Sequence, residues 1–278
     1  MHEGLTDKVA FITGLARGQG RSHAVSLARE GVNIVGLDIC GQFDSVDYAM
    51  STPDDLAETV RQVEEAGAKI VARVGDVRDI ESIRACLDDG LAAFGRVDFV
   101  LANAGIMPIW GRGSNTMQAW HDSLDVLLTG VLNTIEATYP RLVEQGYGGS
   151  IVITSSMAGV QPMIRTLRGK TLGLMGYCAA KAALVNLCEN YASALASYRI
   201  RVNTVHPTGV NTPMVDNDMC RRSLAERDPS DNLTLVSALP VDILEARDIS
   251  NAVVWLCSDE SAFYTGSAMR IDAGASLR

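Results

Sequence analysis

Short apolar segments rich in β-branched residues recur along the whole chain, and stretches with helical spacing separate them. The segments that we predict as strands are residues 8–13, 32–38, 69–74, 97–102, 150–154, 200–205 and 267–271. Strands that alternate with helices form parallel βαβ units, and near-continuous strand hydrophobicity indicates a sheet covered on both faces. The sequence therefore predicts an α/β fold, a doubly wound Rossmann-type parallel sheet of about seven strands with helices on both faces.

The 278 residues contain no linker, repeat or low-complexity tract, so we expect one Rossmann-type domain over residues 1–278. Two connections are long, residues 39–52 and residues 213–240. Long loops beside a compact sheet often carry function, and solvent-facing decoration is the alternative. We expect residues 213–240 to cover the substrate. At the end of the first loop, Thr52 predicts the start of a helix that Gly67 ends.

The charge balance narrows the choice of partner. The chain has 24 Lys+Arg and 33 Asp+Glu, and its net charge of −9 argues against nucleic acid or an anionic membrane, since both require clustered positive charge. We find no apolar window that could span a membrane and no leader segment, so we expect a cytoplasmic protein. The histidines and cysteines show no metal-ligand spacing, so no metal is predicted and a small molecule is the expected partner.

A glycine-rich turn joins the first predicted strand to a predicted helix. Its candidate binding residues are Gly14, Arg17, Gly18, Gln19 and Gly20. Glycines let the backbone approach a pyrophosphate closely, and the free N–H groups and dipole of the helix favour its negative charge. The turn therefore predicts a dinucleotide site, although an ordinary turn also contains glycines.

Asp38 closes the second predicted strand, 20 positions after Gly18. A carboxylate at this place accepts hydrogen bonds from the adenosine ribose and repels a 2′-phosphate, which favours NAD over NADP. Arg17 and Arg21 lie nearby and could instead pair with a phosphate.

Two further strand ends carry candidate binding residues. Asp76 and Val77 follow the third strand and are expected to cap the adenine. Asn103, Ala104 and Gly105 follow the fourth strand. Each group alone could be a plain turn, but together they line the carboxyl ends of successive strands, where sheets of this kind bind ligands.

Tyr177 and Lys181 are four positions apart on a predicted helix, which places the phenol and the ammonium on one face. We expect Lys181, together with an oxidised nicotinamide ring, to lower the Tyr177 pKa toward neutrality and so make a general base. Thr154 and Ser156 end the fifth strand, and the Ser156 hydroxyl is expected to hydrogen-bond a substrate oxygen. Such residues also occur by chance on helices and strand ends, and the glycine turn is what favours catalysis.

Four methionines, Met157, Met163, Met175 and Met214, are expected around the mouth of this site, where they would form an apolar, adaptable pocket. Met is also ordinary core filler, so this is one of two interpretations. Trp110 is assigned to packing.

Taken in chain order, these residues resemble the short-chain dehydrogenase/reductase family. The motifs that carry the resemblance are Thr13-Gly14-x-x-x-Gly18-x-Gly20, Asp38, Asn103-Ala104-Gly105, Ser156 and Tyr177-x-x-x-Lys181. Residues 16–24, 44–46 with 52–60, and 206–214 resemble its actinobacterial mycofactocin-coupled branch, which includes carveol dehydrogenase-like enzymes.

The resemblance implies oxidation of a secondary alcohol of apolar, terpenoid or alicyclic character by hydride transfer to tightly bound NAD, with the peptide-derived carrier mycofactocin as electron acceptor. Tyr177 would be the base, Lys181 would lower its pKa and hold the nicotinamide ribose, and Ser156 would orient the substrate oxygen. The Val210 amide and Thr212 would hold the carboxamide. Thr154 and Pro207 are assigned to the same cofactor site, and a homotetramer is expected by analogy.

The chain departs from the family pattern in two places. Leu127 stands where the family usually has an Asn that anchors a proton-relay water, and Asn133 lies about 240° further around the helix, on another face. Between Ser156 and Tyr177 the chain is longer than usual by about eight residues. This insertion is expected to bulge over the substrate mouth, either as a lid that reads anions or as a solvated loop, and its basic residues are Arg165, Arg168 and Lys170.

Two alternatives remain open at this point. One is a 3-oxoacyl-(acyl-carrier-protein) reductase, whose acidic carrier protein would dock on the basic insertion. The other, motivated by Leu127, is a non-catalytic NAD-binding scaffold or sensor.

Overall fold

The computed structural model describes residues 2–164, 166–226 and 237–277. Its main sheet has seven parallel strands in the order β3-β2-β1-β4-β5-β6-β9. The strands are β1 (Val9–Thr13), β2 (Asn33–Asp38), β3 (Ile70–Val74), β4 (Phe99–Ala102), β5 (Gly149–Thr154), β6 (Ile200–Pro207) and β9 (Ala268–Ile271). The predicted seven-stranded doubly wound sheet is confirmed, and each strand lies within two residues of its predicted bounds.

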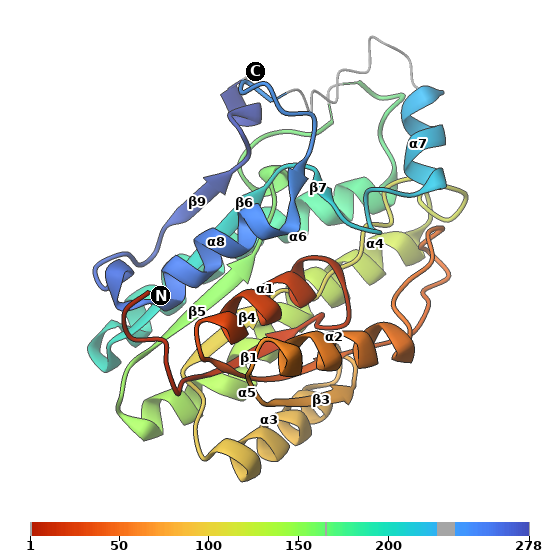
Figure 1. Ribbon diagram of the computed structural model, residues 1–278. Coiled ribbons are helices and arrows are strands. Elements are labelled where there is room, and N and C mark those ends of the chain that lie inside the picture. Colours follow the sequence, from red (N-terminus) through yellow and green to blue (C-terminus); the bar gives the residue numbers. More distant parts are fainter. Residues whose placement is uncertain (1, 165, 227–236, 278) are drawn as a thin grey trace.

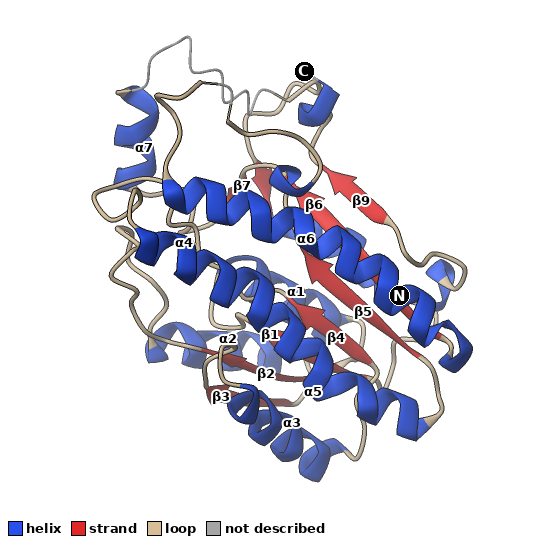
Figure 2. Cartoon of the chain, turned by 180° about the vertical axis from the view of Figure 1, so that it is seen from behind, coloured by secondary structure: helices blue, strands red, loops and turns tan. Residues whose placement is uncertain are grey.

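Helices cover both faces of the sheet. On one face lie α1 (Gly18–Arg29), α2 (Pro53–Glu65) and α8 (Ala246–Cys257), which are in front in Figure 1. On the other face lie α3 (Ile80–Phe94), α4 (Met117–Leu124), α5 (Gly130–Gln145) and α6 (Leu172–Leu195), which are in front in Figure 2. Each face has its own apolar core, and β1 contributes to both because its side chains alternate between the two faces and are all buried.

Local signals set the helix boundaries. Thr52 caps α2 with a reciprocal box, in which its hydroxyl accepts from the Asp55 amide and the Asp55 carboxylate accepts from the Thr52 amide. The predicted start at Thr52 is therefore confirmed. Gly67, with a φ of +93°, follows the end of the helix, where the left-handed backbone favours glycine.

Three local features were not predicted from the sequence. A second small sheet pairs β7 (Val210–Asn211) with β8 (Leu244–Glu245), whose two-residue strands are too short to give a periodic signal. Residues Asp125–Thr129 form a π-helical turn between α4 and α5. The long connection at 213–240 contains α7 (Asp218–Ala225), and its residues 227–236 lie outside the described part of the chain. No helix in the described residues is long and apolar enough to cross a membrane.

Candidate functional site

Three neighbouring cavities follow the carboxyl ends of the strands on either side of the point where the strand order reverses, between β1 and β4. We name them the Asp76 cavity (Gly14, Leu37, Asp38, Ile39, Phe43, Met50, Gly75, Asp76, Val77, Ala104, Gly105, Ile106, Val126), the glycine-turn cavity (Gly14, Arg17, Gly18, Gln19, Gly20, Asp38, Tyr48, Met50, Asn103, Gly105, Thr212, Pro213, Met214) and the methionine cavity. The methionine cavity is lined by Gln19, Met107, Ile109, Trp110, Ser155, Ser156, Met157, Met163, Leu174, Tyr177, Pro207, Thr208, Gly209, Val210, Thr212, Met214 and Val215. Shared wall residues link each cavity to the next, so the three form one cleft where doubly wound sheets bind dinucleotides.

The glycine turn has the close backbone approach that a pyrophosphate requires. Gly14 and Gly18 have φ of +71° and +57°, and a Cβ on Gly20 would lie 1.9 Å from the Gly14 carbonyl oxygen. Gln19 lines both the glycine-turn and the methionine cavities, and its side-chain amide oxygen is buried without a hydrogen-bond partner. Since buried acceptors are normally satisfied, these residues fit a dinucleotide that brings its own donors.

Asp38 lies at this cleft with its carboxylate already engaged. It accepts from the Ala16 amide at 2.9 Å, the Cys40 amide at 3.1 Å and the Ser51 hydroxyl at 2.6 Å. A carboxylate has about four acceptor positions, so capacity remains for a ribose hydroxyl. Arg21, the alternative phosphate partner, instead donates to Ala16, Asp55 and Thr59 and ties α1 to α2. Arg17 lines the glycine-turn cavity and donates to the Ala49 carbonyl.

Asp76 and Val77 lie together with Asp38 around the Asp76 cavity, as predicted for an adenine site, and Ala104 and Gly105 complete its wall. Asn103 lines the glycine-turn cavity, but its amide also has a structural role. That amide donates to the carbonyls of Thr13 at 3.1 Å and Gly14 at 3.4 Å, which holds the turn in place between β1 and β4.

The connection at residues 39–52 forms a wall of the cleft. Phe43, Tyr48 and Met50 line its cavities, and the sequence did not single them out. The connection is fastened to the protein at several points: the Tyr48 hydroxyl accepts from the Met107 amide at 3.1 Å, and the Ser45 hydroxyl donates to the Asp122 carboxylate at 2.6 Å. Its unusual length was the sequence signal, and its apolar side chains in an otherwise polar loop are the signal that could have identified these residues.

Tyr177, on the first part of α6, faces Ser156 beyond the end of β5. Ser156 and Tyr177 both line the methionine cavity, and the Ser156 side chain is near enough to the Tyr177 phenol to act on its pKa. Burial raises the Tyr177 pKa, and the Ser156 hydrogen bond opposes this shift. The prediction that these groups converge is confirmed, whereas the predicted lowering of the Tyr177 pKa is not found for the protein alone.

Lys181 lies one helical turn further along α6, with its nitrogen 5.8 Å from the centre of the Tyr177 ring. Its ammonium donates to the Thr154 carbonyl at 2.6 Å, and burial lowers the Lys181 pKa to about 7. Burial therefore works against the positive charge that would lower the Tyr177 pKa. The burial of Tyr177 itself is the largest cause of its raised pKa, and it is the physical reason for the difference from the prediction.

His206 supports Ser156 from β6. Its Nδ1 donates to the Ser156 carbonyl at 2.8 Å, while its Nε2 accepts from the Thr204 hydroxyl at 2.8 Å. Burial lowers the His206 pKa, which favours the neutral ring that this pattern of bonds requires. The histidine therefore positions the backbone of Ser156.

The methionine cavity encloses about 110 Å³ and is lined mainly by apolar side chains. Met157, Met163 and Met214 line it as predicted, but Met175 does not and is 38% exposed on α6. Trp110, which we assigned to packing alone, forms part of the wall. Pro207, Val210 and Thr212 line the same cavity, as expected for a nicotinamide site. Within the described residues, no group of acidic, histidine and cysteine side chains could hold a metal.

Comparison with known proteins identifies the family, because residues 8–221 match the short chain dehydrogenase family. The chain belongs to this family. It is 49% identical over 97% of its length to an uncharacterised oxidoreductase of Mycobacterium tuberculosis, of which 96% is covered. Two solved structures resemble it closely. The short chain dehydrogenase from Mycobacterium paratuberculosis bound to NAD has a TM-score of 0.90 and 42% identity, with 99% of each chain covered. Carveol dehydrogenase from Mycobacterium avium in complex with NAD has a TM-score of 0.89 and 40% sequence identity, with 100% of each chain covered.

Leu127 remains a departure from the short-chain dehydrogenase pattern. It lies within the π-helical turn, is 1% exposed, and its side chain packs closely against Gly105. Asn133 does not replace the missing amide, because its side chain donates to the carbonyls of Val77 at 3.0 Å and Arg78 at 3.2 Å. The expectation that Asn133 faces elsewhere is confirmed.

The insertion between Ser156 and Tyr177 reaches the cavity through Met163. Leu167 in the same segment is 88% exposed. Arg165, the first of its three basic residues, lies outside the described residues. The segment is thus in part a wall of the cavity and in part exposed to solvent.

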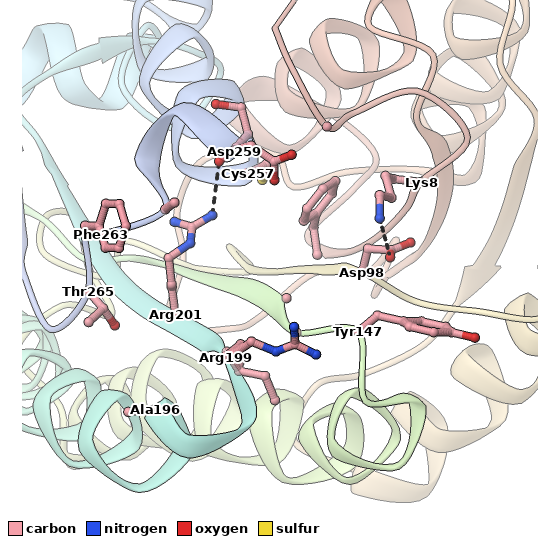
Figure 3. Close-up of a pocket in the computed structure, with 17 residues that line it drawn as sticks. Lys8, Asp98, Tyr147, Ala196, Arg199, Arg201, Cys257, Asp259, Phe263 and Thr265 are labelled. Atoms are coloured by element: carbon pink, nitrogen blue, oxygen red, sulfur yellow. Dashed lines mark hydrogen bonds and ion pairs between the residues drawn. The ribbon is translucent and has the colours of Figure 1, made fainter.

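A larger cavity of about 480 Å³ lies at the opposite edge of the sheet, among the amino ends of the strands. Figure 3 shows the Lys8–Asp98 ion pair on one side of it and Arg201 on the other. It contains none of the predicted site residues. In doubly wound sheets ligands bind at the carboxyl ends of the strands, so the cleft described above is the candidate functional site.

Proposed function

We propose that the protein oxidises an apolar secondary alcohol, of terpenoid or alicyclic type, to the ketone, with NAD as hydride acceptor and Tyr177 as general base. The observation that carries the proposal is that Ser156 and Tyr177 line the same methionine cavity, with Lys181 one helical turn beyond Tyr177 on α6. This cavity shares Gln19, Thr212 and Met214 with the glycine-turn cavity, so a substrate there would lie beside the end of a bound dinucleotide.

The chain would hold NAD along the cleft. Asp76 and Val77 would border the adenine, Asp38 the ribose and the glycine turn the pyrophosphate, while Val210 and Thr212 would hold the carboxamide. When bound, NAD supplies the acceptor for the hydride that leaves the carbinol carbon.

The remaining chemistry belongs to the protein. Ser156 would orient the alcohol oxygen, and Tyr177 would take the hydroxyl proton onto its phenolate oxygen. Lys181, anchored on the Thr154 carbonyl, would supply positive charge beneath the phenol when it is protonated. The apolar walls would exclude water from this proton transfer.

The substrate class follows from the wall of the cavity. A secondary alcohol in an apolar ring system would bury its hydrocarbon against Met107, Met157, Met163, Met214 and Leu174. The carveol dehydrogenase from Mycobacterium avium, at 40% identity, supports this choice.

We propose further that NAD stays bound between turnovers. The connection at residues 39–52 supports this, because Phe43 and Tyr48 are 7% and 4% exposed and Tyr48 is held on the Met107 amide. A cofactor behind such a wall could leave only after the hydrogen bonds that hold the connection in place had broken. The electrons of the reduced, bound NAD would then pass to a carrier such as mycofactocin, in the cytoplasm.

The quaternary structure is a proposal by family analogy: a homotetramer that uses the long helices α5 and α6. Leu187 on α6 is half-buried and available to such an interface, whereas Leu127 is buried within the subunit. Light scattering on the purified protein measures the mass of the assembly and so tests whether it is a tetramer.

The proposed function is tested with purified protein, using carveol with the bound NAD and, separately, a 3-oxoacyl thioester supplied with NADH. We expect bound NAD to be reduced by carveol, and multiple turnovers to require an artificial electron acceptor. A response to the 3-oxoacyl thioester alone would contradict the proposal, and steady release of NADH into solution would contradict permanent NAD binding. Denatured protein should release NAD, identified by its spectrum and mass.

A further inference from the structure

The Thr208 hydroxyl is a buried polar group in the methionine cavity that has no hydrogen-bond partner. Buried hydroxyls are nearly always paired, because leaving one unpaired costs about 1–3 kcal/mol. We infer that Thr208 binds a second oxygen of the substrate, so that the preferred substrates are alicyclic alcohols that carry another hydroxyl, ether or carbonyl oxygen. This inference rests on the proposed function and specifies its substrate class.

The other hydroxyl groups of the cavity are already engaged, as far as the described residues show. Ser155 donates to the Lys181 carbonyl at 2.9 Å, and Thr212 to the Val210 carbonyl at 3.3 Å. Ser156 accepts from the Ala158 amide at 3.2 Å and lies beside Tyr177, the proposed base, in the same cavity. Among these hydroxyls, Thr208 is therefore the one that can still both donate and accept hydrogen bonds to a ligand.

Thr208 is distinguished from Gln19, whose amide oxygen is likewise buried without a partner beside this cavity. Gln19 also lines the glycine-turn cavity, which assigns it to the cofactor side, whereas Thr208 lines the methionine cavity and not the glycine-turn cavity. Pro207 and Val210, which are assigned to the nicotinamide, also line the methionine cavity, so the test measures NAD binding beside diol binding to separate the two ligands.

The backbone on both sides of Thr208 is fixed. Pro207 ends β6 and lies in register with Ile271 of β9, and the Gly209 carbonyl accepts from the Leu244 amide at 3.1 Å. Because the backbone is held on both sides of Thr208, this segment loses little conformational entropy when it binds a ligand. A threonine hydroxyl can donate or accept, so it matches any oxygen function of a substrate.

The position also explains how selectivity would arise in an apolar cavity. Apolar walls alone discriminate weakly between molecules that differ by a hydroxyl, whereas a hydroxyl built to bond the substrate rejects an analogue that leaves it unpaired. Ser156 and Tyr177 would take the reacting oxygen, and Thr208 would select for the second one.

The test compares cyclohexanol with 1,2-, 1,3- and 1,4-cyclohexanediol in the wild-type protein and in Thr208→Val and Thr208→Ser. Valine keeps the shape of the side chain and removes the hydroxyl, and serine retains the hydroxyl. We expect at least one diol to be preferred over cyclohexanol, and Thr208→Val to lower kcat/KM for that diol about three- to tenfold through KM, the range of one lost hydrogen bond. The loss of kcat/KM in Thr208→Val should be smaller for cyclohexanol than for that diol, and Thr208→Ser should retain the preference for the diol.

A binding measurement separates recognition from chemistry. Trp110 lies in the wall of the same cavity, so its fluorescence reports the dissociation constant of each diol. We expect Thr208→Val to weaken binding of the preferred diol and to leave NAD binding unchanged. Equal losses for cyclohexanol and the diols, an unchanged diol preference, or weaker NAD binding would each overturn the inference. Oxidation of none of the alcohols by the wild-type protein, with diol binding still dependent on Thr208, would instead contradict the proposed function.

Discussion

The ammonium of Lys181 donates a 2.6 Å hydrogen bond to the Thr154 carbonyl at the end of β5, and this bond fixes α6 against the central strand of the site. Tyr177, one helical turn earlier, is thereby held beside Ser156 at the rim of the cleft. The same bond keeps Lys181 buried. Burial makes the positively charged form of Lys181 less favourable in free energy and so lowers its pKa.

Lys181 should make stability depend on pH in a defined window. Its pKa is lowered from 10.5 to about 7 in the folded protein, so between these values the unfolded chain binds a proton that the folded one does not. The unfolding free energy of the wild type, measured without cofactor, should therefore rise with pH across this window relative to Lys181→Met, by up to about 1.4 kcal/mol per pH unit. Chemical denaturation at several pH values measures the difference, and parallel pH curves for the two proteins would contradict it.

Ser156→Ala should displace the pH–rate profile of alcohol oxidation to higher pH. The Ser156 hydrogen bond opposes the rise in the Tyr177 pKa that burial causes, so its removal raises that pKa further. Ser155→Ala is the matched control, because the Ser155 hydroxyl donates to the Lys181 carbonyl. Its profile should keep the wild-type midpoint. Profiles of kcat/KM that shift equally in both variants would exclude this role of Ser156.

Gly20→Ala should prevent NAD from binding. A Cβ at this position would lie 1.9 Å from the Gly14 carbonyl oxygen, so the glycine turn must move. At Gly41 the nearest atom to an added Cβ is 3.5 Å away, and Gly41→Ala should bind NAD normally. Isothermal titration calorimetry, with thermal unfolding as a check of folding, makes the comparison. Normal NAD affinity in Gly20→Ala would show that the turn does not hold the cofactor.

Ser51→Ala should accelerate NAD release. Its hydroxyl bonds the Asp38 carboxylate at 2.6 Å and so fastens the connection at residues 39–52 to the cleft. A hydrogen bond to a charged group is worth about 1.5–3 kcal/mol, so a rise of roughly tenfold or more in the release rate is expected. Release is followed by exchange against labelled NAD. Ser258→Ala, which removes a buried serine at the opposite edge of the sheet, serves as the control and should exchange at the wild-type rate.

The sequence predicted those parts of the fold and site that depend on chain order and strand ends. Asp38, Asp76 and Gly105 converge because parallel strands bring their carboxyl ends to one edge, which follows from topology alone. Tyr177 and Lys181 share a helix face because of their spacing.

What the sequence did not predict depends on tertiary packing. Tyr48 and Met50 reach the cleft through the folding of a long connection, which leaves no periodic pattern in the sequence. Met163 lines the cavity and Met175 does not, although both precede Tyr177. The Tyr177 pKa is raised in the protein alone because Tyr177 is deeply buried, and the depth of burial is a property of the folded molecule that the sequence does not show.

The most direct test of the central claim is a single-turnover measurement on the protein loaded with NAD, comparing the wild type with Tyr177→Phe. Carveol should produce the absorbance of reduced nicotinamide in the wild type, and Tyr177→Phe should slow its appearance by roughly a hundredfold or more while NAD remains bound. Equal rates in the two proteins would contradict the assignment of Tyr177 as the base, and with it the account of this site.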